Sequence, residues 1–524
     1  MNIIFIILFS LLYVIVRLKK NMHMLQQNFY NENNRYIRWG LKNITSVFRL
    51  DIILLIINII NLFINNEYLI YVNALYILLF IYEYSIQKKE QVKIPLKITS
   101  RVKRMFVTYT ILMIIPIVLN FLLFEDEYIF NIIYSALISL SFFIVFLVNI
   151  INAPIEKIVF NYYKTKAKNK LKTLNLEVIG ITGSYGKTSS KNILNDILSV
   201  KFNSATTPKN FNTKYGLMIT INNHLDKFDE IFIAEMGAFK RGSIKALCDL
   251  VKPKYGIITN IGTAHLETFG SQENIQKGKF ELVESLPEDG IAILNKDDPL
   301  QVSYKIKNKC KVIWIGIDNK DADLVASNIK MRHDGMTFDV YFKELNKTHT
   351  FKTMLLGKPN VYNILSALAF GLYKGMTLEE LEIGVKKIKT IEHRLELKKF
   401  NGKVFIDDAY NSNPVGSKMA LDVLNLMDGL KIVVTPGMIE LGDEQYALNK
   451  KFGEYISEVA DYVILVGKNQ TKPIQEGLKK KKYDEKKLFI INDVKESFKI
   501  VDGIKSNKTK YVLLENDLPD IFNE

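Results

Sequence analysis

The stretch EVIGITGSYGKTSSKNIL, residues 177–194, decides how the second half of this chain should fold. An apolar run that predicts a strand leads into a loop with glycines, and a helical pattern follows from Gly-Lys-Thr onward. Backbone N–H groups at the start of such a helix bind phosphate oxygens. The common phosphate-binding loop has its first glycine five residues before the second, where this chain has Ile181.

The chemistry of phosphate binding gives each part of this loop an expected role. The backbone N–H groups of residues 183–186 should cradle phosphate oxygens, and Lys187 should neutralise the β- and γ-phosphates. The Thr188 hydroxyl should bind Mg²⁺. An ordinary helix start is the alternative interpretation of Gly-Lys-Thr. The ATP-binding residues predicted in this stretch are Gly183, Ser184, Tyr185, Gly186, Lys187, Thr188 and Ser189.

Short apolar runs alternate with helical stretches from residue 177 onward, as in EVIGIT, EIFIAEMG, YGIITNIG and GIAILN. This alternation predicts a mostly parallel sheet with helices on both faces. A second series begins near residue 396 and predicts a smaller doubly wound domain. The strand-rich residues 311–355 between the two series are expected to form the edge of the first sheet.

The first 150 residues are apolar enough to predict a membrane segment. Residues 1–16 carry no charge, and further apolar runs lie near 52–64, 68–82, 105–124 and 128–151. The last two approach the roughly 20 residues that a spanning helix needs, and we predict five spans. The alternative for residues 1–16 is a cleaved signal peptide. Its flanks are wrong, because the positive charges follow the apolar run and no small-residue cleavage site is present.

Charge predicts the orientation of this segment. Residues 17–50 and 87–104 each contain seven Lys or Arg and one acidic residue, whereas the turns at 65–67 and 125–127 contain no Lys or Arg. Positively charged loops remain in the cytoplasm. The N-terminus is therefore expected outside, and everything after residue 151 on the cytoplasmic side.

Composition narrows the function further. The 524-residue chain has a formal charge of +15, but much of the excess lies in short loops between apolar segments, which argues against nucleic acid as a partner. The two cysteines are too few for a disulfide framework or a metal cluster.

Two further residues stand where a metal ligand is expected. Glu235, in IAEMGAF, and His265, in NIGTAHLETFGS, each follow a predicted strand. The carboxyl ends of parallel strands lie at one edge of a sheet, so both should lie beside the phosphate-binding loop. A carboxylate oxygen suits Mg²⁺. For the histidine, a packing or capping role is the alternative.

The order of these and later motifs resembles that of the Mur ligase superfamily over about residues 175–524. The family's spacing T-G-[ST]-x-G-K-[TS] accounts for the displaced glycine. Within the family, AEMGA, AHLETFGS, DDAYNSNP and MIELGDE most resemble the members that add D-alanyl-D-alanine to UDP-muramoyl-tripeptide. The later motifs of the series are KGKFELV, LNKDD, the Asn360/Asn363 pair in KPNVYN, HRLE and DDAYNSNP.

The resemblance implies both a fold and an activity. After the α-helical membrane segment that the apolar runs predict, it implies α/β domains: a P-loop central ATPase domain and a C-terminal Rossmann-like ligase domain. The boundaries would be 1–152 for the membrane domain, 153–175 for a linker, 176–395 for the central domain and 396–524 for the C-terminal domain. The implied activity is ATP- and Mg²⁺-dependent amide-bond formation through an acyl phosphate in peptidoglycan precursor synthesis.

The family's site residues carry over onto matching positions of this sequence. Lys187, Lys279 and His265 are the implied catalytic residues, and Lys279 matches the family's carbamylated lysine. Lys277 is an alternative, and a solvated surface lysine is the plain reading of either. The other implied contacts are Asn295, Arg394 and Asp408 for ATP; Thr188, Glu235, His265 and carbamylated Lys279 for metal; and Asn210, Asn212, Asn411 and Asn413 for substrate.

Three features depart from the family's pattern. The uridine-binding N-terminal domain is missing, and the membrane segment stands in its place. Pro359 replaces the usual histidine before Asn360. The basic Lys-Gly-Ser-Arg stretch near the end is replaced by the acidic LLENDLPDIF. The first and third departures remove substrate determinants and leave the ATP-binding motifs intact.

We therefore expect a cell-membrane ligase whose partners are a peptidoglycan precursor, an amino acid or dipeptide, and the bilayer. Two alternatives in the same class are a lipid-linked acceptor and a poly-γ-glutamate-type reaction. A membrane transport or signalling ATPase should carry charged residues along a pathway, but the polar residues within these spans are mostly Asn, Ser and Tyr. A scaffold without activity is disfavoured because the whole motif series is present.

Overall fold

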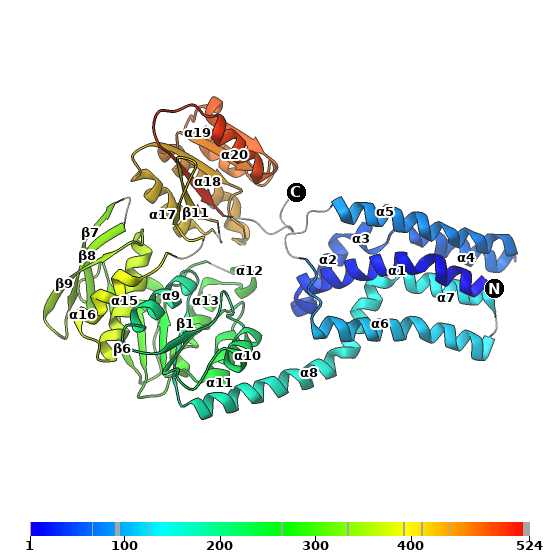
Figure 1. Ribbon diagram of the computed structural model, residues 1–524, viewed down its shortest axis with the longest axis horizontal. Helices are drawn as coiled ribbons and strands as arrows, with labels where there is room; N and C mark the ends of the chain where they lie inside the picture. Colours follow the sequence, from blue (N-terminus) through cyan, green and yellow to red (C-terminus); the bar gives the residue numbers. More distant parts are fainter. Residues whose placement is uncertain are drawn as a thin grey trace. The chain divides into compact units, whose positions relative to one another are not determined.

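The computed structural model describes residues 2–64, 66–89, 95–124, 126–263, 266–332, 335–390, 393–409, 412–439 and 441–516. The chain divides into two units, Met1–Tyr162 and Tyr163–Glu524. The division falls within α8 (Ser141–Leu174), a single helix in Figure 1 that contains most of the predicted linker, residues 153–175. The turns predicted at 65–67 and 125–127 each begin with a residue that lies outside the described ranges.

The N-terminal unit is helical throughout. Two of its described helices, α6 and α8, are long and apolar enough to cross a membrane, and α4 is apolar but has only 14 residues. Five spans therefore remain a prediction from the sequence. The helices before α8 are α1 (Asn2–Gln27), α2 (Arg35–Lys42), α3 (Ile44–Val47), α4 (Asp51–Ile64), α5 (Tyr76–Lys89), α6 (Ser100–Leu119) and α7 (Glu127–Ser139).

Helix α4 turns its polar side chains inward and its hydrocarbon outward. Its buried residues are Asp51, Leu54, Asn58 and Asn61. Asn58 Nδ2 donates to Asn73 Oδ1 at 3.0 Å and to Ser135 Oγ at 2.6 Å. Phe63, on the outer side, is 83% exposed. A helix in water shows the opposite arrangement, with its apolar stripe facing the core.

The larger unit contains a nine-stranded sheet in the order β2-β3-β1-β4-β5-β6-β7-β8-β9. The strands from β2 to β7 pair in parallel, and β7, β8 and β9 form an antiparallel edge. The strands are β1 (Glu177–Thr182), β2 (Ser204–Thr206), β3 (Ile231–Glu235), β4 (Tyr255–Ile258), β5 (Ile291–Asn295), β6 (Lys311–Gly316), β7 (Leu324–Arg332), β8 (Gly335–Phe342) and β9 (Lys347–Thr353). The predicted mostly parallel sheet and its strand-rich edge are thereby confirmed.

Helices connect these strands as the alternating pattern predicts. The central strands β3, β4 and β5 are buried along their whole length, which explains their continuous apolar runs. Figure 1 shows the antiparallel edge beside α16. The helices of this part are α9 (Lys187–Leu198), α10 (Lys214–Asn223), α11 (Ser243–Val251), α12 (Leu266–Phe269), α13 (Gln272–Phe280), α14 (Pro299–Val302), α15 (Lys358–Tyr373) and α16 (Leu378–Lys387).

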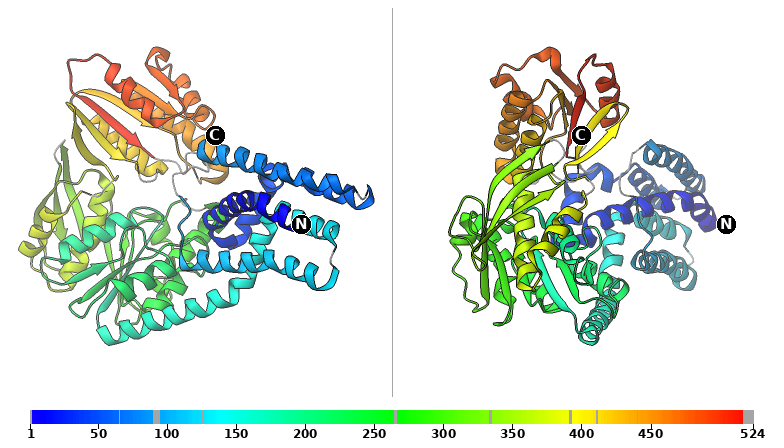
Figure 2. Two further views of the ribbon diagram at one scale, coloured as in Figure 1. Left: turned by 45° about the vertical axis from the view of Figure 1, so that its right-hand side comes forward. Right: turned by 60° about the vertical axis from the view of Figure 1, so that its left-hand side comes forward.

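A second sheet of six strands follows, in the order β10-β11-β15-β12-β13-β14. All its pairs are parallel except β10 with β11, and the red C-terminal strand β15 lies inside the sheet (Figure 2). The elements are β10 (Glu396–Phe400), β11 (Lys403–Asp408), β12 (Leu430–Thr435), β13 (Tyr462–Val466), β14 (Leu488–Ile491) and β15 (Lys510–Glu515), with α17 (Pro414–Asn425), α18 (Gln445–Val459), α19 (Lys472–Lys480) and α20 (Val494–Gly503).

Candidate active site

The loop between β1 and α9 depends on its two glycines. Gly183 has φ 155° and Gly186 has φ 78°, values that favour residues without a side chain. A Cβ on Gly183 would lie 2.0 Å from Thr259 Oγ1. The loop therefore needs glycine at 183 on both counts, whereas Ile181 is a fully buried strand residue. These two constraints explain why the glycine stands at position 183 and not at position 181.

The segment after β4 braces this loop from the side. Asn260 accepts from the Ser184 backbone N–H through its carbonyl and from the Tyr185 N–H through its side chain, both at 2.9 Å. The Gly262 N–H donates to Ser184 Oγ at 2.9 Å. Thr259 Oγ1 donates to the Tyr185 carbonyl at 2.6 Å. The backbone amides of Ser184 and Tyr185 thus serve to hold the loop, which leaves anion binding to the first turn of α9, whose N–H groups the helix cannot satisfy itself.

Lys187 folds back over the loop. Its Nζ donates to the Gly183 carbonyl at 2.8 Å and to the Ser184 carbonyl at 3.1 Å. Desolvation lowers the pKa of Lys187 to about 8, with the Glu235 carboxylate opposing the shift and the Arg394 guanidinium adding to it. An anion bound at the loop would stabilise the charged form of Lys187 more strongly than the two carbonyl dipoles do.

The carboxylate of Glu235 joins three parts of the chain: the end of β3, helix α9 and the segment before α10. It is 1% exposed at the end of β3. Its Oε2 accepts from Thr188 Oγ1 at 3.1 Å and pairs with Lys191 Nζ at 3.2 Å. Its Oε1 accepts from Asn212 Nδ2 at 3.1 Å. The predicted pair of magnesium ligands, Thr188 and Glu235, is therefore in direct contact.

Lys191 is a site residue that the sequence did not reveal. It is 1% exposed, and besides Glu235 its ammonium contacts the carbonyls of Thr207 at 2.7 Å and Lys209 at 2.6 Å. Lysine is rarely buried, so its place within a helix gave no warning. One signal was available: Lys191 follows Thr188 by three residues and so shares its helix face.

The structure separates the two lysines that the sequence left open. Lys279, in α13, is 1% exposed, and burial together with the Lys187 ammonium holds its pKa well below the usual value. Lys277 is solvated, and its Nζ pairs with Glu273 at 2.6 Å on the exposed surface. Lys279 is therefore the buried lysine near Lys187. The predicted residues His265 and Asn411 lie outside the described residues.

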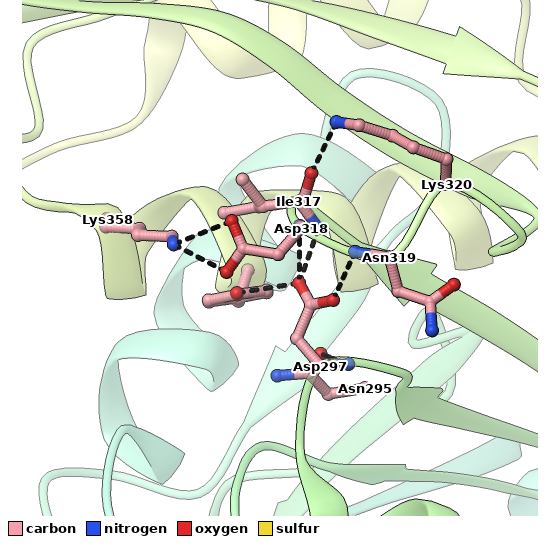
Figure 3. A network of polar contacts seen from close by, with 8 residues as sticks. Asn295, Asp297, Ile317, Asp318, Asn319, Lys320 and Lys358 are labelled. Atoms are coloured by element: carbon pink, nitrogen blue, oxygen red, sulfur yellow. Dashed lines mark hydrogen bonds and ion pairs between the residues drawn. The ribbon is translucent and has the colours of Figure 1, made fainter.

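Asn295 lies at the end of β5 beside a hydrogen-bonded network (Figure 3). Its Oδ1 accepts from the Asp297 N–H at 2.9 Å. The Asp297 carboxylate in turn accepts from the N–H groups of Ile317 at 2.6 Å and Asn319 at 2.7 Å. Tyr362 Oη donates to the same carboxylate at 2.8 Å. The network joins the ends of β5 and β6 to α15 and fixes the position of Asn295.

The two asparagines of α15 have different surroundings. Asn360 Nδ2 donates to the Leu356 carbonyl at 2.8 Å, and α15 has no side-chain cap hydrogen bond at its start. Asn363 is 6% exposed and lies against the glycine loop between β1 and α9, because a Cβ on Gly186 would meet its Oδ1 at 3.5 Å. Only the fold could reveal this contact, since 177 positions separate the two residues in the chain.

Arg394 and Asp408 lie at the junction between the two sheets. The residues on either side of Arg394, His393 and Leu395, have φ values of 59° and 50°, which are unusual for side chains of this size. Leu395 N–H donates to Asp408 Oδ1 at 3.1 Å. Burial raises the pKa of Asp408 to about 6, against the opposing effect of the Arg394 guanidinium.

The described asparagines that were predicted to bind substrate have different surroundings. Asn212 reaches Glu235, whereas the Asn210 side chain is exposed. Asn413 caps α17, with its Oδ1 accepting from the Gly416 N–H at 2.9 Å. The structure therefore gathers Lys187, Thr188, Glu235, Asn212 and Lys279 around one loop, with Lys191 and Asn363 added. It gives Asn413 a helix-capping contact.

Comparisons with known proteins show which proteins this chain resembles. The family model for the Mur ligase middle domain matches residues 181–371, and the model for the Mur ligase, glutamate ligase domain matches residues 393–514. The UDP-N-acetylmuramoyl-tripeptide–D-alanyl-D-alanine ligase of Bacillus subtilis is 35% identical over 58% of this chain and 65% of its own length. The enzyme of the same name from Buchnera aphidicola subsp. Acyrthosiphon pisum is 31% identical over 67% of this chain and 76% of its own length.

Solved structures show the same similarity. MurF from Acinetobacter baumannii superposes with a TM-score of 0.62 at 25% identity, over 68% of this chain and 77% of that one. MurF ligase from Thermotoga maritima in complex with ADP gives a TM-score of 0.61 at 26% identity, over 68% and 80%. This chain spans about 65%, 64% and 61% of the length of three of its curated relatives.

We predict that Lys191→Met destabilises the protein by about 3 kcal/mol, because it leaves the buried Glu235 carboxylate without its cation. Urea unfolding of the full chain in detergent measures the change. The matched control is Lys245→Met, which removes a lysine that pairs with Asp249 on the exposed surface. Equal effects of the two substitutions would show that the buried pair has no special weight.

Proposed function

We propose that this chain, which belongs to the Mur ligase family, is a membrane-attached ATP-dependent ligase that joins an amine to a carboxylate of a peptidoglycan precursor. The observation that carries the proposal is the direct contact between Thr188 and Glu235 beside the glycine loop and Lys187. Residues from separate strands and helices supply these groups, so their convergence supports one site. Two relatives of this chain are named for the addition of D-alanyl-D-alanine.

The residues present fit Mg²⁺ with ATP. Thr188 and Glu235 supply a hydroxyl and a carboxylate, which are the oxygen ligands that Mg²⁺ prefers. Lys191 already pairs with Glu235 Oε2, so a metal ion would share this carboxylate with an ammonium. When bound, the ion would neutralise charge on the phosphates during transfer.

The reaction that these groups support has two steps. The γ-phosphoryl group of ATP passes to the acceptor carboxylate, which gives an acyl phosphate and ADP. The amine then attacks the acyl carbon, and phosphate leaves as the amide forms. Lys187 and the N–H groups at the start of α9 hold the phosphates and stabilise the charge that spreads over them.

Lys279 has the surroundings that carbamylation requires. A neutral amine attacks carbon dioxide to form a carbamate anion with release of a proton, and burial lowers the pKa of Lys279, which favours the neutral amine. The product would be an anion in place of a cation near Lys187, and so a further metal ligand. His265 remains a proposed ligand of the same site.

The C-terminal part completes the site in this proposal. Asn295 would contact the adenine, and Arg394 and Asp408 would reach the nucleotide when the C-terminal domain swings in. The left-handed residues on either side of Arg394 make this junction a natural place for such a movement. The boundaries 176–395 and 396–524 for the central and C-terminal domains belong to the same proposal. So do the P-loop and Rossmann-like assignments.

Membrane attachment through residues 1–152 is supported by the composition of the helical unit. Helices α6 and α8 are long and apolar enough to span, and α4 exposes hydrocarbon around a hydrogen-bonded polar face. A lipid bilayer would cover such a surface. The positive loops favour catalytic domains on the cytoplasmic side.

The acceptor follows as a second part of the proposal. The relatives' names support a muramoyl-tripeptide acceptor and D-alanyl-D-alanine as the amine. The helical unit, which stands where the family has its uridine-binding domain, favours a lipid-linked form of the acceptor over a soluble nucleotide. A poly-γ-glutamate-type acceptor is the remaining alternative.

A phosphate-release screen tests the proposal. It crosses nucleotide-linked and lipid-linked muramoyl peptides with single amino acids and dipeptides, using the full chain in lipid. We expect release that depends on ATP, Mg²⁺ and both organic substrates, and that is faster with the lipid-linked acceptor. Equal rates with the two acceptors would refute the lipid-linked form, and release without any acceptor would favour a simple ATPase.

We predict that Lys187→Ala abolishes ADP formation, because the phosphates lose their cation, while the protein still inserts into membranes. Product analysis measures the first effect, and resistance to alkaline extraction from membranes measures the second. The control is Lys201→Ala, which removes a lysine that is 35% exposed and paired with Glu380. Retained turnover in Lys187→Ala would refute the assignment of the loop.

We predict that Lys279→Ala loses activity and regains part of it when short carboxylates such as formate or acetate are added. The added anion would replace the carbamate as a ligand. Lys277→Ala, which changes an exposed lysine in the same helix, should keep its activity and show no response to added carboxylate. Absence of rescue in Lys279→Ala would favour an unmodified lysine.

A further inference from the structure

Two carboxyl groups meet where the strands β11 and β15 end. The strands are parallel, and Asp408 and Glu515 are Cα partners in their register. Both residues therefore stand at the carboxyl edge of the six-stranded sheet, which is the edge where α/β proteins bind ligands. The nucleotide role proposed above uses Asp408, whereas nothing so far assigns a role to Glu515.

The side chain of Glu515 is held firmly on one side only. It is 0% exposed, and its Oε1 accepts from Ser412 Oγ at 2.6 Å. Its Oε2 has no hydrogen-bond donor among the described residues. The next residue, Asn516, anchors the strand end, because its N–H donates to the Asp408 carbonyl at 3.2 Å and its Nδ2 to the Gly437 carbonyl at 2.6 Å. The backbone that carries this carboxyl group is thus held in place, and one carboxyl oxygen has no donor.

The charges around Asp408 fall into two sets. Its neighbour Asp407 is paired with Lys398 Nζ at 2.6 Å and with His393 Nδ1 at 2.8 Å. Asp408 itself accepts from the Leu395 N–H and lies in the field of the Arg394 guanidinium. The acidic groups that affect its pKa are Glu515, through a side-chain hydrogen bond, and Asp407, through its charge.

Two carboxyl groups in contact in a buried place do not both ionise. Burial raises the pKa of Glu515 well above its usual value, and the Asp408 carboxylate raises it further. Burial raises the pKa of Asp408 only to about 6, because Arg394 opposes the change. Because the Arg394 guanidinium favours the ionised form of Asp408, a proton that the pair shares resides on Glu515. Glu515 Oε2, which has no donor, can then carry this proton and donate it to the Asp408 carboxylate.

We propose that Glu515, as a neutral acid, is a positioning residue that donates a hydrogen bond to Asp408 and holds this carboxylate beside Arg394 for the nucleotide. This inference rests on the proposed function in one respect only, the role of Asp408 in nucleotide binding. The shared proton is a property of the pair alone. The two parts can therefore be tested separately.

Nucleotide binding tests the positioning role. The probe is ADP with Mg²⁺, titrated into the full chain in detergent at pH 7.5 and pH 5.5. In the native protein, protonation of Asp408 should add a loss of about fourfold in affinity over this range, as a pKa near 6 requires. Glu515→Gln keeps a neutral donor and leaves unchanged the burial that raises the pKa of Asp408, so its affinity at pH 7.5 and its additional loss should both match those of the native protein. The protonation of ADP itself changes over the same pH range, but it affects every variant equally and so does not alter the comparison.

Glu515→Ala removes the donor without changing any charge that the native pair carries at pH 7.5. It should weaken ADP binding about tenfold at this pH, the usual cost of losing a hydrogen bond to a charged group. The control is Glu288→Gln, whose side chain is 75% exposed, and it should match the native protein throughout. A Glu515→Gln variant that binds ADP as weakly as Glu515→Ala would overturn the proposal, as would full affinity in Glu515→Ala.

Thermal unfolding tests the shared proton without any nucleotide. The pKa of Glu515 is raised on folding above its ordinary 4.5, so its contribution to stability is complete below pH 4.5 and is lost as the pH rises. The midpoint of the native protein should therefore fall more steeply between pH 5 and pH 8 than that of Glu515→Gln. Parallel curves would refute the pair. Divergent curves without ADP binding would keep the pair and refute the proposed nucleotide role of Asp408.

Discussion

The buried carboxylate of Glu235 is the constraint on which the site depends. An anion removed from water must be matched by donors or cations, or the fold pays several kcal/mol. Thr188, Lys191 and Asn212 meet this demand from α9 and from the segment before α10. The same contacts fix the first turn of α9, and with it the loop that begins at Gly183. Neutralising one charge in this way places a helix, a strand end and a loop relative to each other.

Much of this site could be predicted because parallel strands bring their carboxyl ends to one edge. Thr188 and Glu235 follow from the strand pattern alone, although they lie 47 residues apart. Lys191 could not be predicted with the same ease, because a lysine within a helix gives no sign of burial. The choice between Lys277 and Lys279 required knowing which face of α13 is buried. Asn363 needed the packing of α15 on the loop, which a list of motifs does not contain.

The fold shows the same division between pattern and packing. The two sheets and the strand-rich edge follow from the period of the apolar runs. The N-terminal unit does not, because its helices combine apolar outer faces with inward amides such as Asn58 and Asn73. Hydropathy averages over both faces of a helix and so misses this arrangement. The continuity of α8 across the predicted linker was also invisible, since a basic, lysine-rich stretch fits a linker as well as it fits a helix.

The position of β15 has a consequence for how the protein is made. This strand is the last described element of the chain, yet it lies between β11 and β12 in the middle of the six-stranded sheet. While the ribosome is still synthesising the chain, the two halves of this sheet have no strand to join them, and their facing edges stay open. The six-stranded sheet therefore cannot close until β15 has been synthesised, whereas the nine-stranded sheet can form earlier, as domains that precede others do. Every copy with a complete carboxyl edge at Asp408 is then a copy whose translation has run through residue 515.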